Sequence, residues 1–296
     1  MNISDKLPKS VSQVIEPVTK DLGEFTVRRT LPDKSRQRVG PFIFFDHMGP
    51  AAFPPGSGVS VRPHPHIGIA TITYLFDGII VHKDSLGYDQ PITRGAVNWM
   101  TAGRGVVHSE RSPADLIAKG SHLHGIQAWV ALPIELEETE ARFEHYPESE
   151  IPTVELPGVN LTIIAGEAYG ACSPVKTSSE TIYVEADLEE GATLQTPGEF
   201  DELAVYCVTG HVTVDGYELR PGQMAVFEPH TSATIAAIVA SKIMLPGGAT
   251  LEGERILWWN FVSSSRERIN QAKKDWLEKK FDEVPGETEF IPLPKI

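Results

Sequence analysis

The sequence has few cysteines and no long apolar segment, and each shortage excludes a class of protein. Its 296 residues include only Cys172 and Cys207, in no metal-binding spacing. Two isolated cysteines cannot form a disulfide scaffold, so a reducing compartment is expected. The longest weakly polar stretch, residues 233–241, is far shorter than the roughly 18–20 residues that span a bilayer.

Basic residues are also in deficit. The chain carries 26 Lys and Arg against 40 Asp and Glu, a formal net charge of −14. This charge repels phosphate backbones and anionic lipids, so we expect no direct nucleic-acid or membrane binding. Asp5, Lys6 and Lys9 stand where a secretory signal would be apolar. We therefore predict a cytoplasmic protein.

The abundant residues are those of turns. The 25 glycines and 23 prolines separate short β-branched runs, with no amphipathic helices between them. A parallel sheet would need such helices, so the pattern predicts an all-β, antiparallel sandwich or barrel. The expected strands are 59–62, 69–76, 79–82, 96–100, 106–109, 126–132, 161–165, 181–186, 203–208, 211–214, 224–227 and 234–239.

A segment rich in proline and glutamate at residues 144–158 is typical of a linker. We therefore predict two domains, residues 1–145 and 146–296. Near the C-terminus, Ser264-x-x-Glu267 matches a capping box and predicts a helix of about 17 residues. A proline-rich tail, residues 285–296, follows it.

The two halves contain similar patterns. Tyr74-Leu-Phe-Asp-Gly78 resembles Tyr206-Cys-Val-Thr-Gly210, and a strand follows each glycine. Ile92-Thr-Arg-Gly95-Ala-Val97 resembles Leu219-Arg-Pro-Gly222-Gln-Met224. The repetition predicts one β unit used twice, although two unrelated all-β halves could show it by chance.

Six of the ten histidines lie between residues 64 and 124. Residues two apart on a strand point to the same face. His64 and His66 therefore present two imidazoles to one point, and His108 and Glu110 present an imidazole and a carboxylate. An HxH motif alone means little, but HxH with HxE predicts that these four residues bind one metal ion. His82 could support them as a hydrogen-bond partner, or lie on the surface.

Three imidazoles and one carboxylate suit a borderline divalent ion such as Fe, Mn, Ni, Cu or Zn. No cysteine lies near the four residues, so a closed structural zinc site is not expected. A six-coordinate ion would keep two positions open for substrate, O2 or water. Open positions predict chemistry or sensing.

The segments HPHIGIATITYLFDG, HKDSLG, WMTAGRGVVHSE and VGPFIFFDHMGP, and the C-terminal ERILWWNFVSSSRERI, resemble the pirin family of the cupin superfamily. The resemblance covers nearly the whole chain. It implies a bicupin of two antiparallel, jelly-roll β-barrels with a C-terminal helix, and Fe(II) in the N-terminal barrel. Its motifs place the ligands at His64, His66, His108 and Glu110.

The chain departs from the family pattern beside the HxH motif. Many pirins read HPHRGFET, whereas Ile67, Ile69 and Ala70 replace the Arg, Phe and Glu here. Substrate choice and redox tuning are therefore open. The second half lacks HxH and HxE and contains only His211 and His230, so we expect it to bind no metal.

The resemblance implies two functions. One is a quercetin 2,3-dioxygenase-type cleavage of a flavonol ring with O2, in which Glu110 would be the catalytic base. An apolar slot for the aromatic substrate is predicted from Phe44, Phe45, Met48, Trp99 and Met100. The alternative is a non-enzymatic, iron-dependent redox sensor that binds a protein partner. Another cupin activity, such as isomerisation, also stays open.

Overall fold

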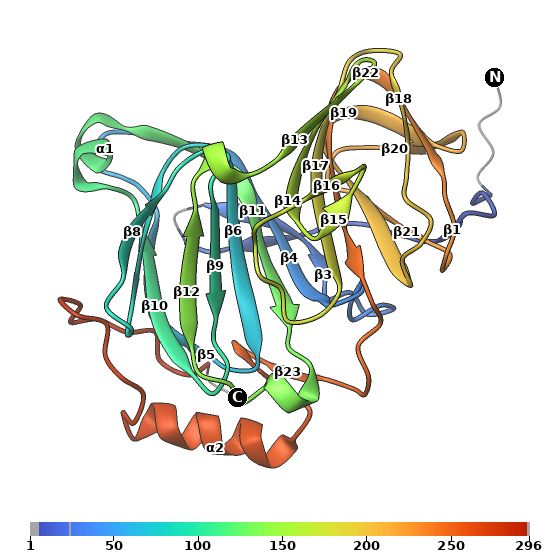
Figure 1. Ribbon diagram of the computed structural model, residues 1–296. Coiled ribbons are helices and arrows are strands. Elements are labelled where there is room, and N and C mark those ends of the chain that lie inside the picture. The colour runs from blue at the N-terminus through green and yellow to red at the C-terminus, as the bar shows by residue number, and fades with distance from the viewer. Residues whose placement is uncertain (1–5, 24, 295–296) are drawn as a thin grey trace. The chain divides into compact units, whose positions relative to one another are not determined.

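The computed structural model describes residues 6–23 and 25–294 (Figure 1). Its two α-helices, among the described residues, are α1 (Ala114–Lys119) and α2 (Arg266–Leu277), and nearly all other regular structure is β-strand. The strand pairs within each sheet are antiparallel wherever a register is given. The predicted all-β, antiparallel class is confirmed.

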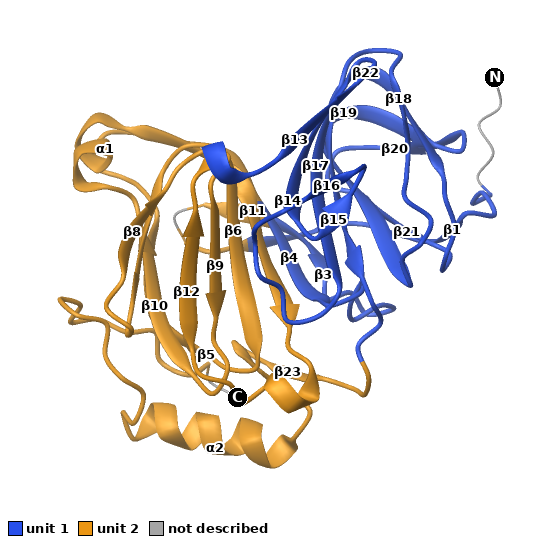
Figure 2. Cartoon of the chain, viewed as in Figure 1, with its two compact units in different colours: residues 1–20, 28–47, 149–251 blue, residues 21–27, 48–148, 252–296 orange. Residues whose placement is uncertain are grey.

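The chain divides into two compact units that are not continuous in sequence (Figure 2). Unit 1 contains residues up to 20, 28–47 and 149–251, and unit 2 contains 21–27, 48–148 and 252–296. The break after residue 148 lies within the segment 144–158, while residues 6–20 belong to unit 1 and residues 252–294 to unit 2. β1 (Val11–Ile15) pairs with β21 (Met224–Phe227) in unit 1, and α2 packs in unit 2.

Unit 1 contains a nine-stranded sheet, ordered β1-β21-β19-β22-β17-β14-β13, with β18 on β22 and β20 on β19. Its interior is an aliphatic cluster that includes Leu203, Val205, Val214 and Ala225. The other strands of this unit are β13 (Thr153–Leu156), β14 (Val159–Ala165), β15 (Glu167–Ala168), β16 (Ala171–Cys172), β17 (Thr181–Leu188), β18 (Thr193–Gln195), β19 (Glu202–Val214), β20 (Tyr217–Leu219) and β22 (Thr234–Gly248).

Unit 2 contains a four-stranded sheet, β5-β10-β7-β8, and the strands β12-β9-β6-β11 of a seven-stranded sheet that continues as β4-β3-β2. The strands β2 (Val18–Asp21), β3 (Thr26–Leu31) and β4 (Phe42–Phe53) have residues in both units. The others are β5 (Ser60–His66), β6 (Ile69–Asp77), β7 (Ile80–Asp84), β8 (Asp89–Ile92), β9 (Val97–Thr101), β10 (Val106–Arg111), β11 (Ser121–Ala131), β12 (Arg142–Tyr146), β23 (Ile256–Trp258) and β24 (Phe261–Ser263). Short 3-10 turns span Ile134–Leu136 and Glu148–Glu150.

The sequence repeat corresponds to a structural one. β6 and β9 pair Tyr74 with Val97, and β19 and β21 pair Tyr206 with Met224, at equivalent positions of the motifs. In each unit, the glycine of the second motif also donates a backbone hydrogen bond to the first motif. The Gly95 N–H donates to the Leu75 carbonyl at 2.9 Å, and the Gly222 N–H donates to the Cys207 carbonyl at 2.8 Å. One β unit is therefore used twice.

The C-terminal helix is present, but it starts later and is shorter than predicted. Ser265, not Ser264, caps α2, and its hydroxyl accepts the Arg268 N–H at 3.2 Å. The Ser264 N–H and hydroxyl instead donate to the buried Glu137 carboxylate. The helix buries Ile269 and Ala272 against Phe261 and Ile67.

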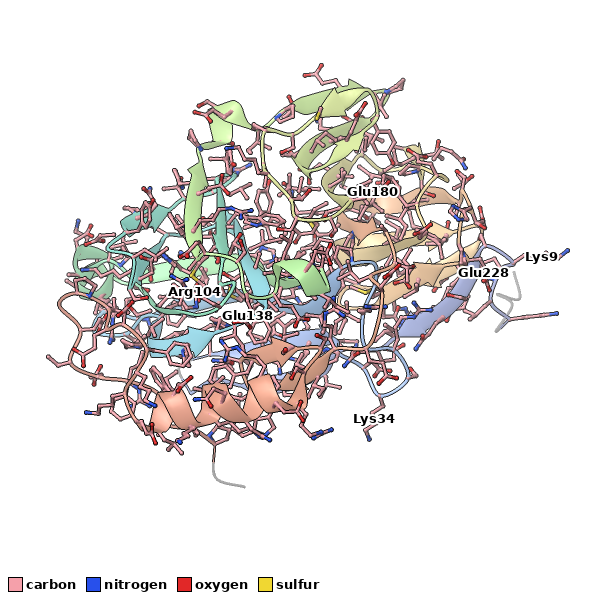
Figure 3. All side chains as sticks on the ribbon, turned by 60° about the horizontal axis from the view of Figure 1, so that its bottom comes forward. Lys9, Lys34, Arg104, Glu138, Glu180 and Glu228 are labelled. Carbon is pink, nitrogen blue, oxygen red and sulfur yellow. The ribbon has the colours of Figure 1, made fainter. Side chains whose placement is uncertain are left out.

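Most of the acidic residues lie on the surface, although five, among them Asp84, Glu110 and Glu137, are buried. The charged side chains labelled in Figure 3, among them Glu138, Glu180 and Glu228, are all exposed. Among the described residues, neither helix is long and apolar enough to cross a bilayer.

Candidate metal centre

The two sheets of unit 2 pack face to face, and the predicted metal ligands lie between them. β5 carries His64 and His66, and β10 carries His108 and Glu110. Three contacts reach across from the other sheet. The Thr73 hydroxyl lies 3.1 Å from Glu110, Trp129 packs edge-on against His66, and Phe143 stacks on His82.

The three imidazoles converge. One ring nitrogen from each of His64, His66 and His108 lies within 4.8 Å of the other two, and all three residues are buried. The His66 and His108 Nε2 atoms are 3.1 Å apart. Two nitrogens bound at a right angle to one ion, each at about 2.1 Å, would be separated by about 3.0 Å. The nitrogens therefore fit a single metal ion.

Hydrogen bonds direct the ligand nitrogens. His64 Nδ1 lies 2.9 Å from the Arg62 carbonyl oxygen, which can only accept. The proton of a neutral His64 is therefore on Nδ1, and Nε2 keeps the lone pair that a metal needs.

His108 is oriented by two further residues. Asp84 is fully buried and accepts the backbone N–H groups of Leu86 and Tyr88. His82 Nε2 donates to Asp84 at 3.0 Å, so Nδ1 of a neutral His82 is an acceptor. That atom lies 3.3 Å from His108 Nδ1, which must then carry the proton. With this proton on Nδ1, the lone pair of His108 is on Nε2, the atom that faces the other imidazoles.

Burial keeps these imidazoles neutral. Desolvation lowers the pKa of His64 to about 4 and the pKa values of His66 and His108 well below the usual 6.5. Burial also raises the pKa of Glu110, against the opposing effects of His82 and the Thr73 hydrogen bond. A cation in the centre would favour the carboxylate form instead.

Glu110 lies on the same strand face but outside the three-histidine cluster. Thr73 Oγ1 is 3.1 Å from Glu110 Oε1 and 2.8 Å from Gln127 Oε1. A hydroxyl has one proton, so it cannot donate to both oxygens. A protonated Glu110 that donates to Thr73, which donates to Gln127, satisfies all three groups.

The five residues predicted to line a substrate slot lie in different places. Phe45 is buried against Tyr206, and the Arg29 guanidinium lies 4.2 Å from the Phe44 ring centroid. Met48 belongs to a separate apolar cluster.

Met100 and Trp99 are neighbours on β9 and therefore point to opposite faces. Met100 pairs with Thr71 and Phe143, and Phe143 packs on His82, so Met100 shares the site's face. Trp99 points away from it. The slot itself stays a prediction.

The departures from the family pattern are part of the apolar packing. Ile67, Ile69 and Ala70 are fully buried, and Ile67 packs against Phe261, Ile269 and Ala272. The sequence motifs do not point to Asp84, Thr73 or Gln127. The His82-x-Asp84 spacing repeats the HxE pattern and could have drawn attention to Asp84.

Comparison with known proteins identifies relatives along most of the chain. The Pirin family model matches residues 24–130, and the model of the Pirin C-terminal cupin domain matches residues 183–282. A "Pirin-like protein" of Caulobacter vibrioides is 48% identical over 290 residues, which cover 96% of this chain and 100% of that protein.

Two solved structures from Acinetobacter baumannii, each described as quercetin 2,3-dioxygenase, have similar folds. One has a TM-score of 0.90 at 32% identity, covering 96% of this chain and 95% of its own. The other has a TM-score of 0.87 at 26% identity, covering 92% of this chain and 98% of its own. The predicted jelly-roll bicupin fold is confirmed.

Proposed function

The chain belongs to the pirin family, and from that premise we propose that it is a metal-dependent dioxygenase that opens a flavonol such as quercetin with O2. The observation that carries the proposal is the buried convergence of His64, His66 and His108. The similarity to structures described as quercetin 2,3-dioxygenase supports the substrate class.

We propose His64, His66, His108 and Glu110 as the residues that hold the ion, and Fe(II) as that ion among the metals that suit this donor set. When bound, the ion would supply Lewis-acid and redox chemistry toward the flavonol and O2. Unit 2, which contains these four residues, would be the metal-binding unit, and unit 1 would hold no metal.

Glu110 is the proposed base. A cation in the centre would keep Glu110 as the carboxylate, the form that can accept the proton of the flavonol 3-hydroxyl. Thr73 and Gln127 orient the carboxyl and offer the proton a hydrogen-bonded path. His82 and Asp84 hold His108 in the tautomer that binds metal.

Oxygen uptake tests the proposal. Protein loaded anaerobically with Fe(II) is mixed with quercetin and O2, and uptake is compared with metal content. We expect stoichiometric uptake by the wild type and by His211→Ala, whose histidine lies in unit 1. We expect Glu110→Gln, which cannot take the proton, to lose uptake even where it holds metal.

Absence of uptake by wild-type protein that holds one metal per chain would contradict the dioxygenase. It would favour the alternative of a redox sensor with a protein partner, for which a pull-down with the oxidised and reduced forms is the next experiment.

A further inference from the structure

The pairing of the two ligand strands is irregular at the ligands. His108 of β10 pairs with His64 of β5, and the register then shifts before Glu110. Ser109 lies within this bulge and has no regular partner on β5, where Pro63 has no backbone N–H to donate. Bulges beside functional sites set the direction of nearby side chains. The proposed ligands therefore lie where the hydrogen-bond ladder between β5 and β10 is interrupted.

A C-terminal strap, residues 279–291, contacts both strands at this bulge. Ser109 Oγ donates to Glu287 Oε1 at 2.9 Å, and the Ile291 N–H donates to the Pro63 carbonyl at 2.8 Å. Glu287 also accepts two hydrogen bonds from Arg111, from Nε at 2.9 Å and from Nη2 at 2.8 Å. The strap thus supplies an anchor to each strand where the ladder is interrupted.

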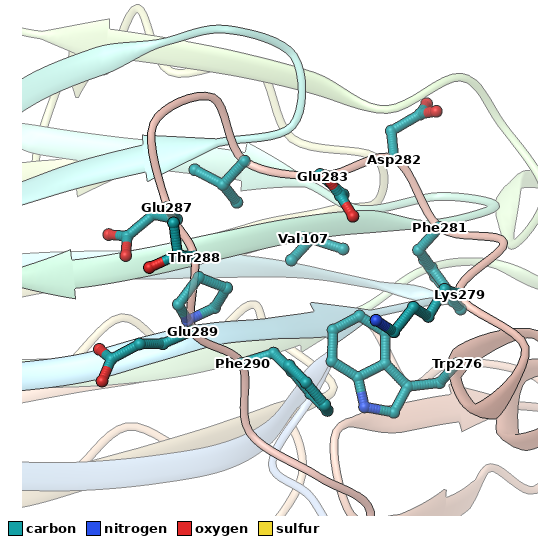
Figure 4. A pocket seen from close by; sticks show the side chains of 12 residues that line it. Val107, Trp276, Lys279, Phe281, Asp282, Glu283, Glu287, Thr288, Glu289 and Phe290 are labelled. Carbon is teal, nitrogen blue, oxygen red and sulfur yellow. The ribbon is translucent and has the colours of Figure 1, made fainter.

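The strap lies on the outer side of the strands. Ser109 alternates with His108 and Glu110, so its side chain points away from the metal centre. Figure 4 shows the strap passing over Val107, around a cavity of about 360 Å³ that no predicted ligand lines. Its contacts can therefore affect the ligands only through the strands.

The strap is itself fixed to the rest of unit 2. Trp276 Nε1 donates to the Ile291 carbonyl at 3.0 Å, and the Phe281 ring stacks on Phe261 with an interplanar angle of 7°. Arg111 Nη1 also donates to Ser60 at the start of β5. These contacts fix the position of the strap, so that it can restrain β5 and β10.

We propose that the C-terminal strap braces the bulge between β5 and β10, and that Glu287 is a positioning residue that sets how fast the metal exchanges. The proposal rests on the proposed metal site and adds a means of control to it. Losing the brace lets the strands shift, so that the ligands leave the ion sequentially and more often.

Release of Co2+ tests the brace. Wild-type protein loaded with Co2+ alone is mixed with excess EDTA, and the loss of the cobalt absorption bands gives the dissociation rate. We expect Glu287→Ala to raise this rate about tenfold, the lower end of the effect on affinity of losing a direct hydrogen-bond partner of a metal ligand, because Glu287 acts on the ligands only through the strands. The bands of the loaded variant should also shift, because the ligand geometry changes.

Glu289→Ala is the matched control. Glu289 also contacts Arg111, at 3.0 Å, but it is exposed and has no contact with Ser109. We expect its release rate to stay within about twofold of the wild type. Glu287→Gln keeps an oxygen that can accept from Ser109 and should recover part of the effect.

A second variant does not depend on Glu287. Ile291→Pro removes the N–H that donates to Pro63 and should also speed release. If Glu287→Ala and Ile291→Pro both fold and release Co2+ at the wild-type rate, the brace is overturned while the proposed function stands. Failure of the wild type to bind Co2+ would overturn both.

Discussion

The two units share one strand arrangement and differ in the residues that line it. The repeated pairing of β6 with β9 and of β19 with β21 aligns their interiors position by position. Four polar residues of unit 2 have an apolar residue at the equivalent position of unit 1. Thr71 corresponds to Leu203, Thr73 to Val205, His82 to Val214, and Asn98 to Ala225.

The comparison shows that the arrangement itself does not make the site. In unit 1, Leu203, Val205, Val214 and Ala225 all belong to the aliphatic cluster. Of the described histidines in that unit, His211 and His230 are not buried, and His47 is engaged with Tyr206. The same scaffold therefore encloses an apolar core in unit 1 and a histidine centre in unit 2.

The largest expected difference between the units is their sensitivity to acid in the metal-free protein. The folded pKa values of His64, His66 and His108 lie below the unfolded value of about 6.5. Between pH 6.5 and about 4, the unfolded chain therefore binds protons that the folded chain does not. The free energy of unfolding should fall on acidification by up to about 4 kcal/mol per pH unit for three groups.

Glu110 acts in the opposite direction, because its raised pKa adds stability at low pH that is lost as the pH rises through the folded value. Three histidines outweigh it. Hydrogen exchange, corrected for intrinsic rates, should show β5 and β10 losing protection at a higher pH than β17 and β19. Simultaneous loss in both units would contradict the comparison.

Removal of a ligand is expected to have the next largest effect. His108→Ala should weaken metal affinity by more than the roughly 10–100-fold typical of outer-shell partners, because a donor atom is lost. Metal content after dialysis and a titration with Co2+ measure this. His230→Ala in unit 1 should leave both unchanged, and a loss of metal there would reveal a second site.

Making unit 2 resemble unit 1 at one position should have a smaller effect. His82→Val introduces the residue found at Val214 and removes the group that fixes His108 Nδ1. We expect metal affinity to fall about 10–100-fold with the fold retained. An unchanged affinity, measured by the same titration, would mean that His82 does not orient His108.

The sequence predicted the three converging histidines and the repeat because both depend on short spacings. HPH and HSE place side chains on one strand face, and glycines at equivalent turns mark the repeated motif. It could not predict that β1 joins β21 or that the strap reaches Ser109, because these contacts join distant segments without a shared pattern. The substrate slot stays a prediction, because aromatic side chains alone do not reveal which sheet face they occupy.

The smallest expected effect comes from the reciprocal exchange at Thr73 and Val205. Val205→Thr places a hydroxyl in the aliphatic interior of unit 1 without an evident partner, and should lower the free energy of unfolding by about 1–3 kcal/mol. Thr73→Val replaces a hydroxyl by a methyl of similar size, but it leaves Glu110 and Gln127 without their shared partner. It should therefore reduce oxygen uptake more than stability. Chemical denaturation and oxygen uptake on both variants separate the two effects. If Val205→Thr and Thr73→Val lose the same stability and neither changes oxygen uptake, the residues that line the two interiors do not account for the difference between the units.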